Sequence, residues 1–132
     1  MTTNYKLAIA VLASSLAGTV GGWVIHAQQT KTAPVYIISE ADTITDLTTI
    51  EKYGERVQDT LAPFAGHYHF VVSGGKAQNL DGQAPTGIVV IAFDNAEQAR
   101  AWYDSPAYQA IRPFRLSAVK GRMFLVEGIK VP

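Results

Sequence analysis

The order of strand and helix patterns along residues 35–129 constrains the fold of this 132-residue chain more than any other feature of its sequence. Six segments follow one another: a strand at 35–40, a helix from 46 to about 62, strands at 67–72 and 86–93, a helix that begins at 94, and a strand within 119–129. This order is the split βαβ pattern. It predicts an α+β fold of ferredoxin-like type, βαββαβ, in which both helices cover one face of a four-stranded antiparallel sheet.

The first helix is indicated by an apolar stripe that recurs every three or four positions, and its members are Leu47, Ile50, Tyr53, Val57, Leu61 and Phe64. Thr45 or Asp46 can cap the start of this helix, and Pro63 together with Gly66 indicates its end. The pattern predicts an amphipathic helix whose apolar face packs against the sheet.

The second helical region contains two start signals. Asp94 followed by Glu97 resembles a capping box, whereas Ser105 before Pro106 combines an N-cap residue with a favourable first helical residue. These signals predict a helix that begins at Asp94 and then a short helical turn that Pro113 ends.

The strand at 86–93 is apolar on both of its faces. If both helices cover one face of the sheet, the other face exposes Val and Ile side chains, and such a patch is usually closed by a partner. The simplest partner is a second copy of the same chain, packed face to face as a homodimer.

The N-terminal region has the layout of an export signal. Residues 7–25 contain no charged side chain, follow Lys6, and are succeeded by a cleavable position after Ala27. The run also reaches nearly the length of about 20 residues that crosses a bilayer, so an uncleaved anchor is the alternative. We expect a signal peptide or membrane anchor at 1–27, a linker at 28–34 and the domain at 35–132, either periplasmic or secreted, or held at the inner membrane by residues 7–25.

Composition excludes several classes of function. The chain has no cysteine, and 11 Lys and Arg residues balance 11 Asp and Glu residues. There is consequently no disulfide framework, thiolate metal site or cysteine nucleophile. The near-neutral charge gives no electrostatic footprint for nucleic acid. No motif indicates a cofactor, and none is expected.

The segment 93–115, FDNAEQARAWYDSPAYQAIRPFR, resembles the signature of the domain-of-unknown-function 1330 family: a strand end, an Ala-rich helix, Trp-Tyr-x-Ser-Pro-x-Tyr and a following Arg. The resemblance spans about residues 35–128 and includes Gly74-Gly75 and Leu80-Asp81-Gly82, where Glu would be expected in place of Asp81. Similar sequences carry a leader that ends in His-Ala-Gln, as at 26–28. The resemblance implies a dimeric α+β barrel, a superfamily that includes cofactor-free monooxygenases, isomerases and haem enzymes, but it implies no particular activity.

Five residues lie where a helix end, a turn and a strand start meet, and they are the first candidates for ligand binding: Trp102, Tyr103, Ser105, Tyr108 and Arg115. An arginine near aromatic rings can hold a carboxylate or an enolate-like anion. The alternative is structural. In that interpretation Ser105 starts a helix, Trp102 anchors the core, Tyr108 covers the sheet edge, and Arg115 pairs with Asp104.

His67 and His69 are further candidates, because residues two apart on a strand face the same side. They could line a barrel cavity or supply two ligands of a metal shell, but no third ligand is evident. No metal site is therefore predicted, and the alternative is a packed or edge pair of histidines.

These observations predict a homodimeric domain that binds a small, partly apolar molecule, either between helices and sheet or within the barrel. One alternative is an enzyme of the cofactor-free monooxygenase or isomerase type, in which a desolvated pocket stabilises a substrate anion. The other is a membrane-anchored interaction module that scaffolds another envelope protein, which a filled interior would favour.

Overall fold

The computed structural model describes residues 33–129. The predicted leader at 1–27 lies outside the described residues, as do most of the predicted linker and the last three residues of the predicted domain. No helix within 33–129 is long and apolar enough to cross a membrane.

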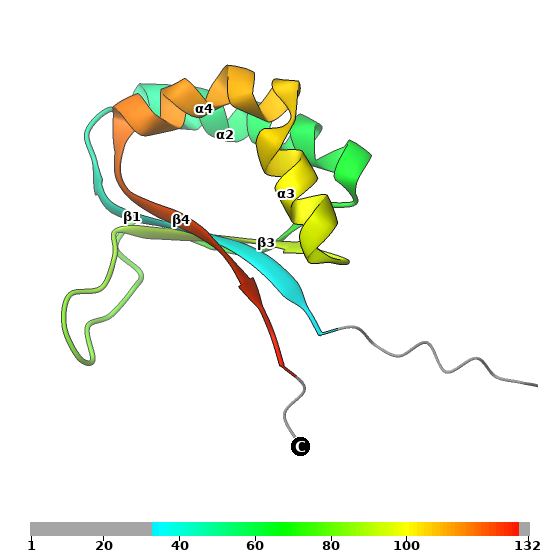
Figure 1. Cartoon of the computed structure of the whole chain (residues 1–132). Coiled ribbons are helices and arrows are strands. Elements are labelled where there is room, and N and C mark those ends of the chain that lie inside the picture. Colours follow the sequence, from blue (N-terminus) through cyan, green and yellow to red (C-terminus); the bar gives the residue numbers. More distant parts are fainter. Residues whose placement is uncertain (1–32, 130–132) are drawn as a thin grey trace, which may run out of the picture. The chain divides into compact units, whose positions relative to one another are not determined.

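The described chain folds into a four-stranded sheet covered by helices on one side (Figure 1). Its elements are β1 (Val35–Ile44), α2 (Leu47–Leu61), the 3-10 turn η2 (Ala62–Phe64), β2 (His67–Val72), β3 (Gly87–Phe93), α3 (Ala96–Asp104), α4 (Pro106–Ala118) and β4 (Val119–Glu127). The strand order is β2-β3-β1-β4, and every neighbouring pair is antiparallel. The predicted ferredoxin-like α+β fold is confirmed.

Helix α2 begins and ends where its sequence signals predict. The Asp46 carboxylate accepts a hydrogen bond from the backbone N–H of Thr49 at 3.0 Å, which caps the first turn. At the other end Ala65, not Gly66, adopts the left-handed conformation, with φ of 54°. Gly66 is needed for a different reason: a Cβ there would lie 2.6 Å from the ring of Phe93.

The second helical region differs from its prediction at both start and stop. Asn95 caps α3 by accepting from the N–H of Gln98 at 2.8 Å, so Asp94 lies one residue before the cap. Ser105 and Pro106 start α4 as predicted, but α4 continues through Pro113 to Ala118. Proline removes one backbone hydrogen bond from the helix. The helix persists because it buries residues on both sides of Pro113, among them Ile111 and Ala118.

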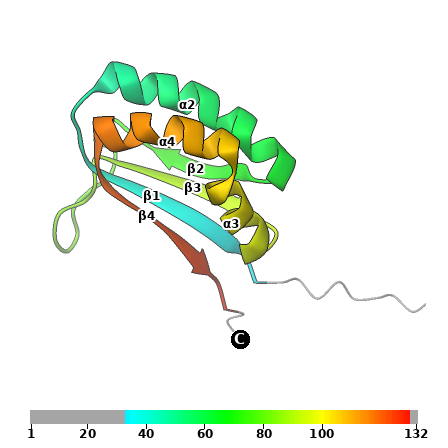
Figure 2. The ribbon, with the colours of Figure 1, turned by 45° about the horizontal axis from the view of Figure 1, so that its top comes forward.

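An aromatic cluster fills the layer between helices and sheet. Trp102 lies between Phe93 and Tyr108, with ring centroids 5.8 Å and 4.1 Å away. Helices α2 and α4 lie side by side over the sheet, and α3 covers one end of it (Figure 2).

The opposite face of the sheet has no helix over it (Figure 1). The strand register aligns one apolar row across this face, formed by Phe70, Val90, Ile38 and Phe124. Phe70 and Phe124 at the ends of the row are 47% and 38% exposed, whereas Val90 is covered by its neighbours and is 5% exposed. The predicted apolar face is present, although its most exposed members are phenylalanines instead of Val and Ile.

Candidate functional site

A cavity of about 360 Å³ lies between α2 and the sheet, and we call it the inner cavity. Its wall is mainly apolar and is formed by α2, by β1, β2 and β3, and by the start of β4; members include Ile44, Ile50, Tyr53, Val57, Tyr68, Ile88, Val89, Ile91, Val119 and Met123. Small-molecule sites commonly occupy about 300–1,000 Å³, so the inner cavity suits a small ligand.

One buried arginine, Arg115, lines the inner cavity. It lies in the last turn of α4 and is 7% exposed. Its Nε has no hydrogen-bond partner. Within residues 33–129 Arg115 forms no salt bridge, and the salt bridge present joins Arg122 to Glu40. A buried guanidinium without an acidic partner is costly to the free protein, because burial removes its hydration. The arrangement is therefore suited to accept an anion from outside.

Two tyrosines, Tyr53 and Tyr68, line the inner cavity together with Arg115. Tyr53, which lines the inner cavity, has its hydroxyl oxygen 3.2 Å from that of Tyr108. Burial raises the pKa of Tyr53, and the neighbouring Tyr108 adds to the shift. Burial also raises the pKa of Tyr68, another residue of the wall. These phenols therefore stay protonated at neutral pH and can donate hydrogen bonds to a ligand.

The polar groups of the inner cavity suit binding better than proton abstraction. Among the described residues that line the inner cavity, one has a carboxylate, Glu51, and its side chain is exposed. None of these residues is a histidine. A general base must reach the proton that it removes. The wall thus offers a cation and hydrogen-bond donors for an anion, together with apolar surface for the rest of a ligand.

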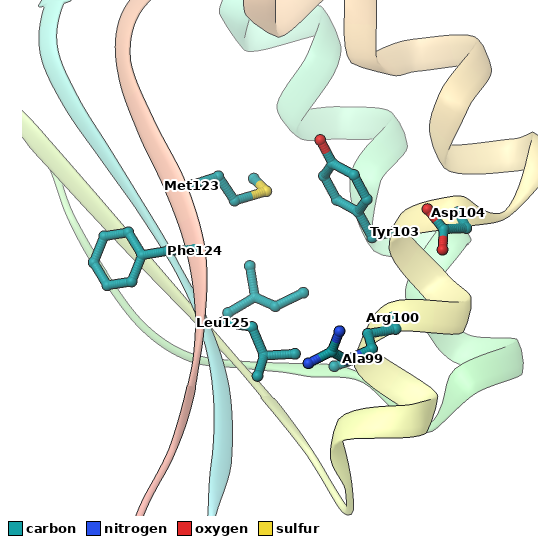
Figure 3. Close-up of a pocket in the computed structure, with 8 residues that line it drawn as sticks. Ala99, Arg100, Tyr103, Asp104, Met123, Phe124 and Leu125 are labelled. Atoms are coloured by element: carbon teal, nitrogen blue, oxygen red, sulfur yellow. The ribbon is translucent and has the colours of Figure 1, made fainter.

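A second cavity of about 350 Å³ lies between α3 and the strands β1 and β4, and we call it the outer cavity. Ile37, Met123 and Leu125 form its floor, while Tyr103, Arg100 and Asp104 come from α3 (Figure 3). Figure 3 also shows Phe124 pointing away from α3, as the alternation along a strand requires. Both Arg100 and Asp104 are exposed, so charge gathers at the mouth of the outer cavity.

The sequence candidates do not form one cluster around a ligand. Trp102 is fully buried and donates from Nε1 to Thr60 Oγ1 at 2.9 Å. Ser105 Oγ accepts from the N–H of Tyr108 and donates to the carbonyl of Trp102, so it is a helix cap. Neither Trp102 nor Ser105 lines either cavity. The contacts of these two residues are therefore structural: Trp102 anchors the core and Ser105 starts a helix.

The remaining candidates from that segment lie in different places. Arg115 lines the inner cavity, whereas Tyr103 lines the outer cavity and packs against the Arg112 guanidinium. Tyr108 is fully buried, and its ring lies 5.4 Å from the ring of Tyr103. The alternative pairing of Arg115 with Asp104 does not occur among the described residues.

His67 and His69 lie on the uncovered face of the sheet. The register places His67 beside Ala92, whose other neighbour is Tyr36, and the ring of His69 packs 5.1 Å from the ring of Tyr36. An irregularity between Tyr68 and Phe70 makes His69 an extra residue of β2. In the described part of the chain, no three metal-ligating side chains gather here or elsewhere.

Sequence reasoning missed three residues of the cavity walls: Tyr53, Tyr68 and Met123. Tyr53 is the only residue with a hydroxyl in the apolar stripe of the first predicted helix, and this hydroxyl is the sequence feature that could have identified it as a site residue. Tyr68 lies between the two histidines, and its inward direction follows from strand alternation. No local signal identifies Met123, because its role depends on where β4 pairs with β1.

Comparison with known families decides the classification. Residues 34–129 match the model of the family described as domain of unknown function (DUF1330). The chain belongs to the DUF1330 family. Among curated proteins, no match was found. Family membership confirms the resemblance carried by the segment 93–115, and it leaves the activity of this DUF1330 domain to be inferred from its site.

Several solved structures share the fold of the DUF1330 domain. A protein of unknown function from Rhodopseudomonas palustris superposes with a TM-score of 0.58 at 10% identity, covering 98% of this chain and 97% of that chain. SnoaB, a cofactor-independent oxygenase from Streptomyces nogalater, gives 0.54 at 9% identity and covers 75% and 96%. A dimeric ferredoxin-like protein of unknown function from Bacteroides fragilis gives 0.50 at 14% identity and covers 71% and 95%. At these identities the likeness concerns the fold alone.

Proposed function

We propose that this domain binds a small, largely apolar molecule with one anionic group in the inner cavity, with the anion at Arg115. The observation that carries the proposal is the buried Arg115 guanidinium, whose Nε has no partner, in the wall of an otherwise apolar cavity. A ligand anion there would form charge-assisted hydrogen bonds in a poorly hydrated place, where such bonds are strong.

The proposed domain is a homodimer that packs the uncovered sheet faces of two copies against each other. The apolar row from Phe70 to Phe124 supports this partner, because a contiguous exposed apolar patch usually marks an interface. The Bacteroides fragilis protein of the same fold is dimeric, which is consistent with self-association. The domain would then be a dimeric α+β barrel with one inner cavity in each protomer.

We further propose that residues 1–27 direct the domain out of the cytoplasm. The uncharged run 7–25 after Lys6 supports export. Cell fractionation with N-terminal sequencing of the mature protein tests this proposal. A periplasmic or secreted chain that begins near Gln28 indicates a cleaved signal, a membrane-bound chain with residue 1 intact indicates an anchor, and a soluble cytoplasmic chain would refute export.

An enzyme of the cofactor-free oxygenase type is the second candidate function. The Arg115 guanidinium and the Tyr53 hydroxyl in one cavity wall favour it, because together they could stabilise an enolate or phenolate. The substrate would have to ionise without help from a histidine of the wall. The likeness to SnoaB adds only that the fold can support such chemistry.

The binding proposal is tested with 2-naphthoate and its neutral analogue 2-naphthalenemethanol, added to the ¹⁵N-labelled protein. The Nε–Hε resonance of Arg115 reports directly on the site. We expect naphthoate to shift this resonance and to bind at least about tenfold more tightly than the alcohol. This factor corresponds to the lower end of the net free energy that a hydrogen bond to a charged group contributes.

The matched variants are Arg115→Gln and Arg112→Gln, two arginines of α4 of which only Arg115 lines the inner cavity. Arg115→Gln should abolish the preference for the carboxylate, and Arg112→Gln should keep it. An equal loss in both variants would refute a specific role of Arg115. Native mass spectrometry of protein from its own envelope complements this test: an added small mass supports binding, whereas a ligand-free protein that carries a second polypeptide supports the interaction module instead.

A further inference from the structure

Met123 is shared by the two cavities. It projects from β4 toward the helices and forms part of the wall of both the inner and the outer cavity (Figure 3). Along β4, Val119 belongs to the inner cavity and Leu125 to the outer cavity, so Met123 lies between them. The two spaces therefore follow one another along the same strand and are divided at this side chain.

Met123 packs against the hydrophobic core, and the polar contact of its side chain is weak. Its sulfur accepts a hydrogen bond from the Tyr108 hydroxyl at 3.6 Å, and a thioether is a poor acceptor. The Tyr108 hydroxyl keeps a second neighbour in Tyr53, so it is not left without a partner if the contact to sulfur is lost. Methionine is unbranched and has three rotatable side-chain bonds, which lets it adapt to an incoming group.

We propose, building on the binding function above, that Met123 is a movable partition and that the ligand is an elongated apolar monocarboxylate. The carboxylate lies at Arg115 in the inner cavity, and the chain passes Met123 into the outer cavity toward Tyr103. The ligand then occupies both cavities, with its tail between α3 and β4.

Charge determines the head group and its direction. Arg115 is buried without an acidic partner, whereas Arg100 at the outer mouth is exposed and can remain hydrated. An anion gains more by compensating the buried cation. A phosphate monoester carries more than one negative charge at neutral pH and would leave an excess in the cavity, whereas a carboxylate matches one guanidinium in charge and in planar geometry.

Straight-chain carboxylates from hexanoate to hexadecanoate test the proposal on the complete mature protein. The chain contains two methionines, Met1 and Met123, so methyl-labelled methionine gives an assignable signal for the partition. All members should shift the Arg115 Nε–Hε resonance, and the shift of the Met123 methyl resonance should increase sharply once the chain is long enough to pass Met123. Affinity should continue to rise past that length, by about fourfold per methylene when each is fully buried.

Variants at the partition separate the two proposals. Met123→Ala should tighten the long carboxylates severalfold relative to the short ones, whereas Met123→Phe should cancel the gain from added length. If short carboxylates bind at Arg115 but neither variant changes the length dependence, the partition is refuted and the binding function stands. If no carboxylate shifts the Arg115 resonance, the binding function itself fails. Arg100→Gln tests the direction: a tenfold loss there with no loss in Arg115→Gln would reverse the proposed orientation.

Discussion

The hydroxyl oxygens of Tyr53 and Tyr108 lie 3.2 Å apart, although the two residues are separated by 55 positions in the sequence. Tyr53 comes from α2 and Tyr108 from the first turn of α4. Because the Tyr108 hydroxyl also reaches the Met123 sulfur, one short chain of contacts links both helices to β4. Because the contacts share the Tyr108 hydroxyl, Tyr53 and Tyr108 should respond together to mutation.

Tyr108→Phe should lower the free energy of unfolding by about 0.5–1.5 kcal/mol, the usual value of one net hydrogen bond. Urea denaturation of the single variants and of Tyr53→Phe/Tyr108→Phe measures the coupling. Because either single change leaves the other buried hydroxyl short of a partner, the double variant should lose less than the sum of the two. Strictly additive losses would mean that the two hydroxyl groups do not interact.

Stability should fall above about pH 10, and Tyr53 should contribute to the fall. The pKa of Tyr53 is raised in the folded protein by burial, so in alkali the unfolded chain releases this proton first. The stabilisation is complete below the unfolded pKa and decreases as pH rises past it, by at most about 1.4 kcal/mol per pH unit for one group. Urea unfolding of the wild type and Tyr53→Phe at about pH 9 and about pH 11 checks this. An equal loss in both proteins would contradict it.

Trp102→Ala should destabilise the domain by about 3–5 kcal/mol, as expected for deletion of a large core side chain. Trp102 is fully buried against Phe93 and Tyr108, and its Nε1 donates to Thr60. Thermal and urea unfolding measure the effect. Thr60→Ala is the comparison, because it removes the acceptor of the Trp102 hydrogen bond and leaves the indole ring in place. An unchanged melting temperature for Trp102→Ala would show that the ring carries little of the packing.

The sequence predicts the fold well because each element carries its own local signal. The stripe of the first helix, the cap at Asp46 and the start at Ser105 and Pro106 all act within a few residues. Pro113 shows where local reasoning fails: its intrinsic tendency to end a helix is overcome by burial of Ile111 and Ala118, which only the assembled core provides.

The site is predicted less completely, for the same physical reason. The sequence indicates Arg115 because it follows a group of aromatic residues where a helix end, a turn and a strand start meet. Tyr53 and Tyr68, which line the same cavity, come from distant segments. Tyr103 and Arg115 are close in sequence, but they line different cavities because α3 and α4 run in different directions. Proximity in sequence therefore suggested one cluster where the fold makes two spaces.

Phe124→Glu should dissociate the proposed homodimer. Phe124 lies in the apolar row of the uncovered face and is 38% exposed in the single chain, so a carboxylate there would be buried without a partner in the dimer. We expect the dimer to weaken by about two orders of magnitude or more, because burying an unpaired carboxylate costs several kcal/mol. Analytical ultracentrifugation measures this, with Leu80→Glu as control, because Leu80 is an almost fully exposed loop residue. A Phe124→Glu protein that remains as dimeric as Leu80→Glu would place the interface elsewhere.

Arg115→Met should make the ligand-free protein more stable while removing anion binding. Methionine fills much of the same volume, and the change relieves the cost of burying a guanidinium whose Nε lacks a partner. We expect a gain of about 1–4 kcal/mol in the free energy of unfolding, the range seen when buried charges are replaced by apolar residues. Urea unfolding without and with 2-naphthoate separates the two effects. Naphthoate should stabilise the wild type and leave Arg115→Met unchanged, because only a ligand that binds the folded state shifts its stability. A gain in stability fits a functional role, since native residues kept at a cost in stability are those that function requires. A destabilised Arg115→Met protein would instead assign the guanidinium a structural role in α4.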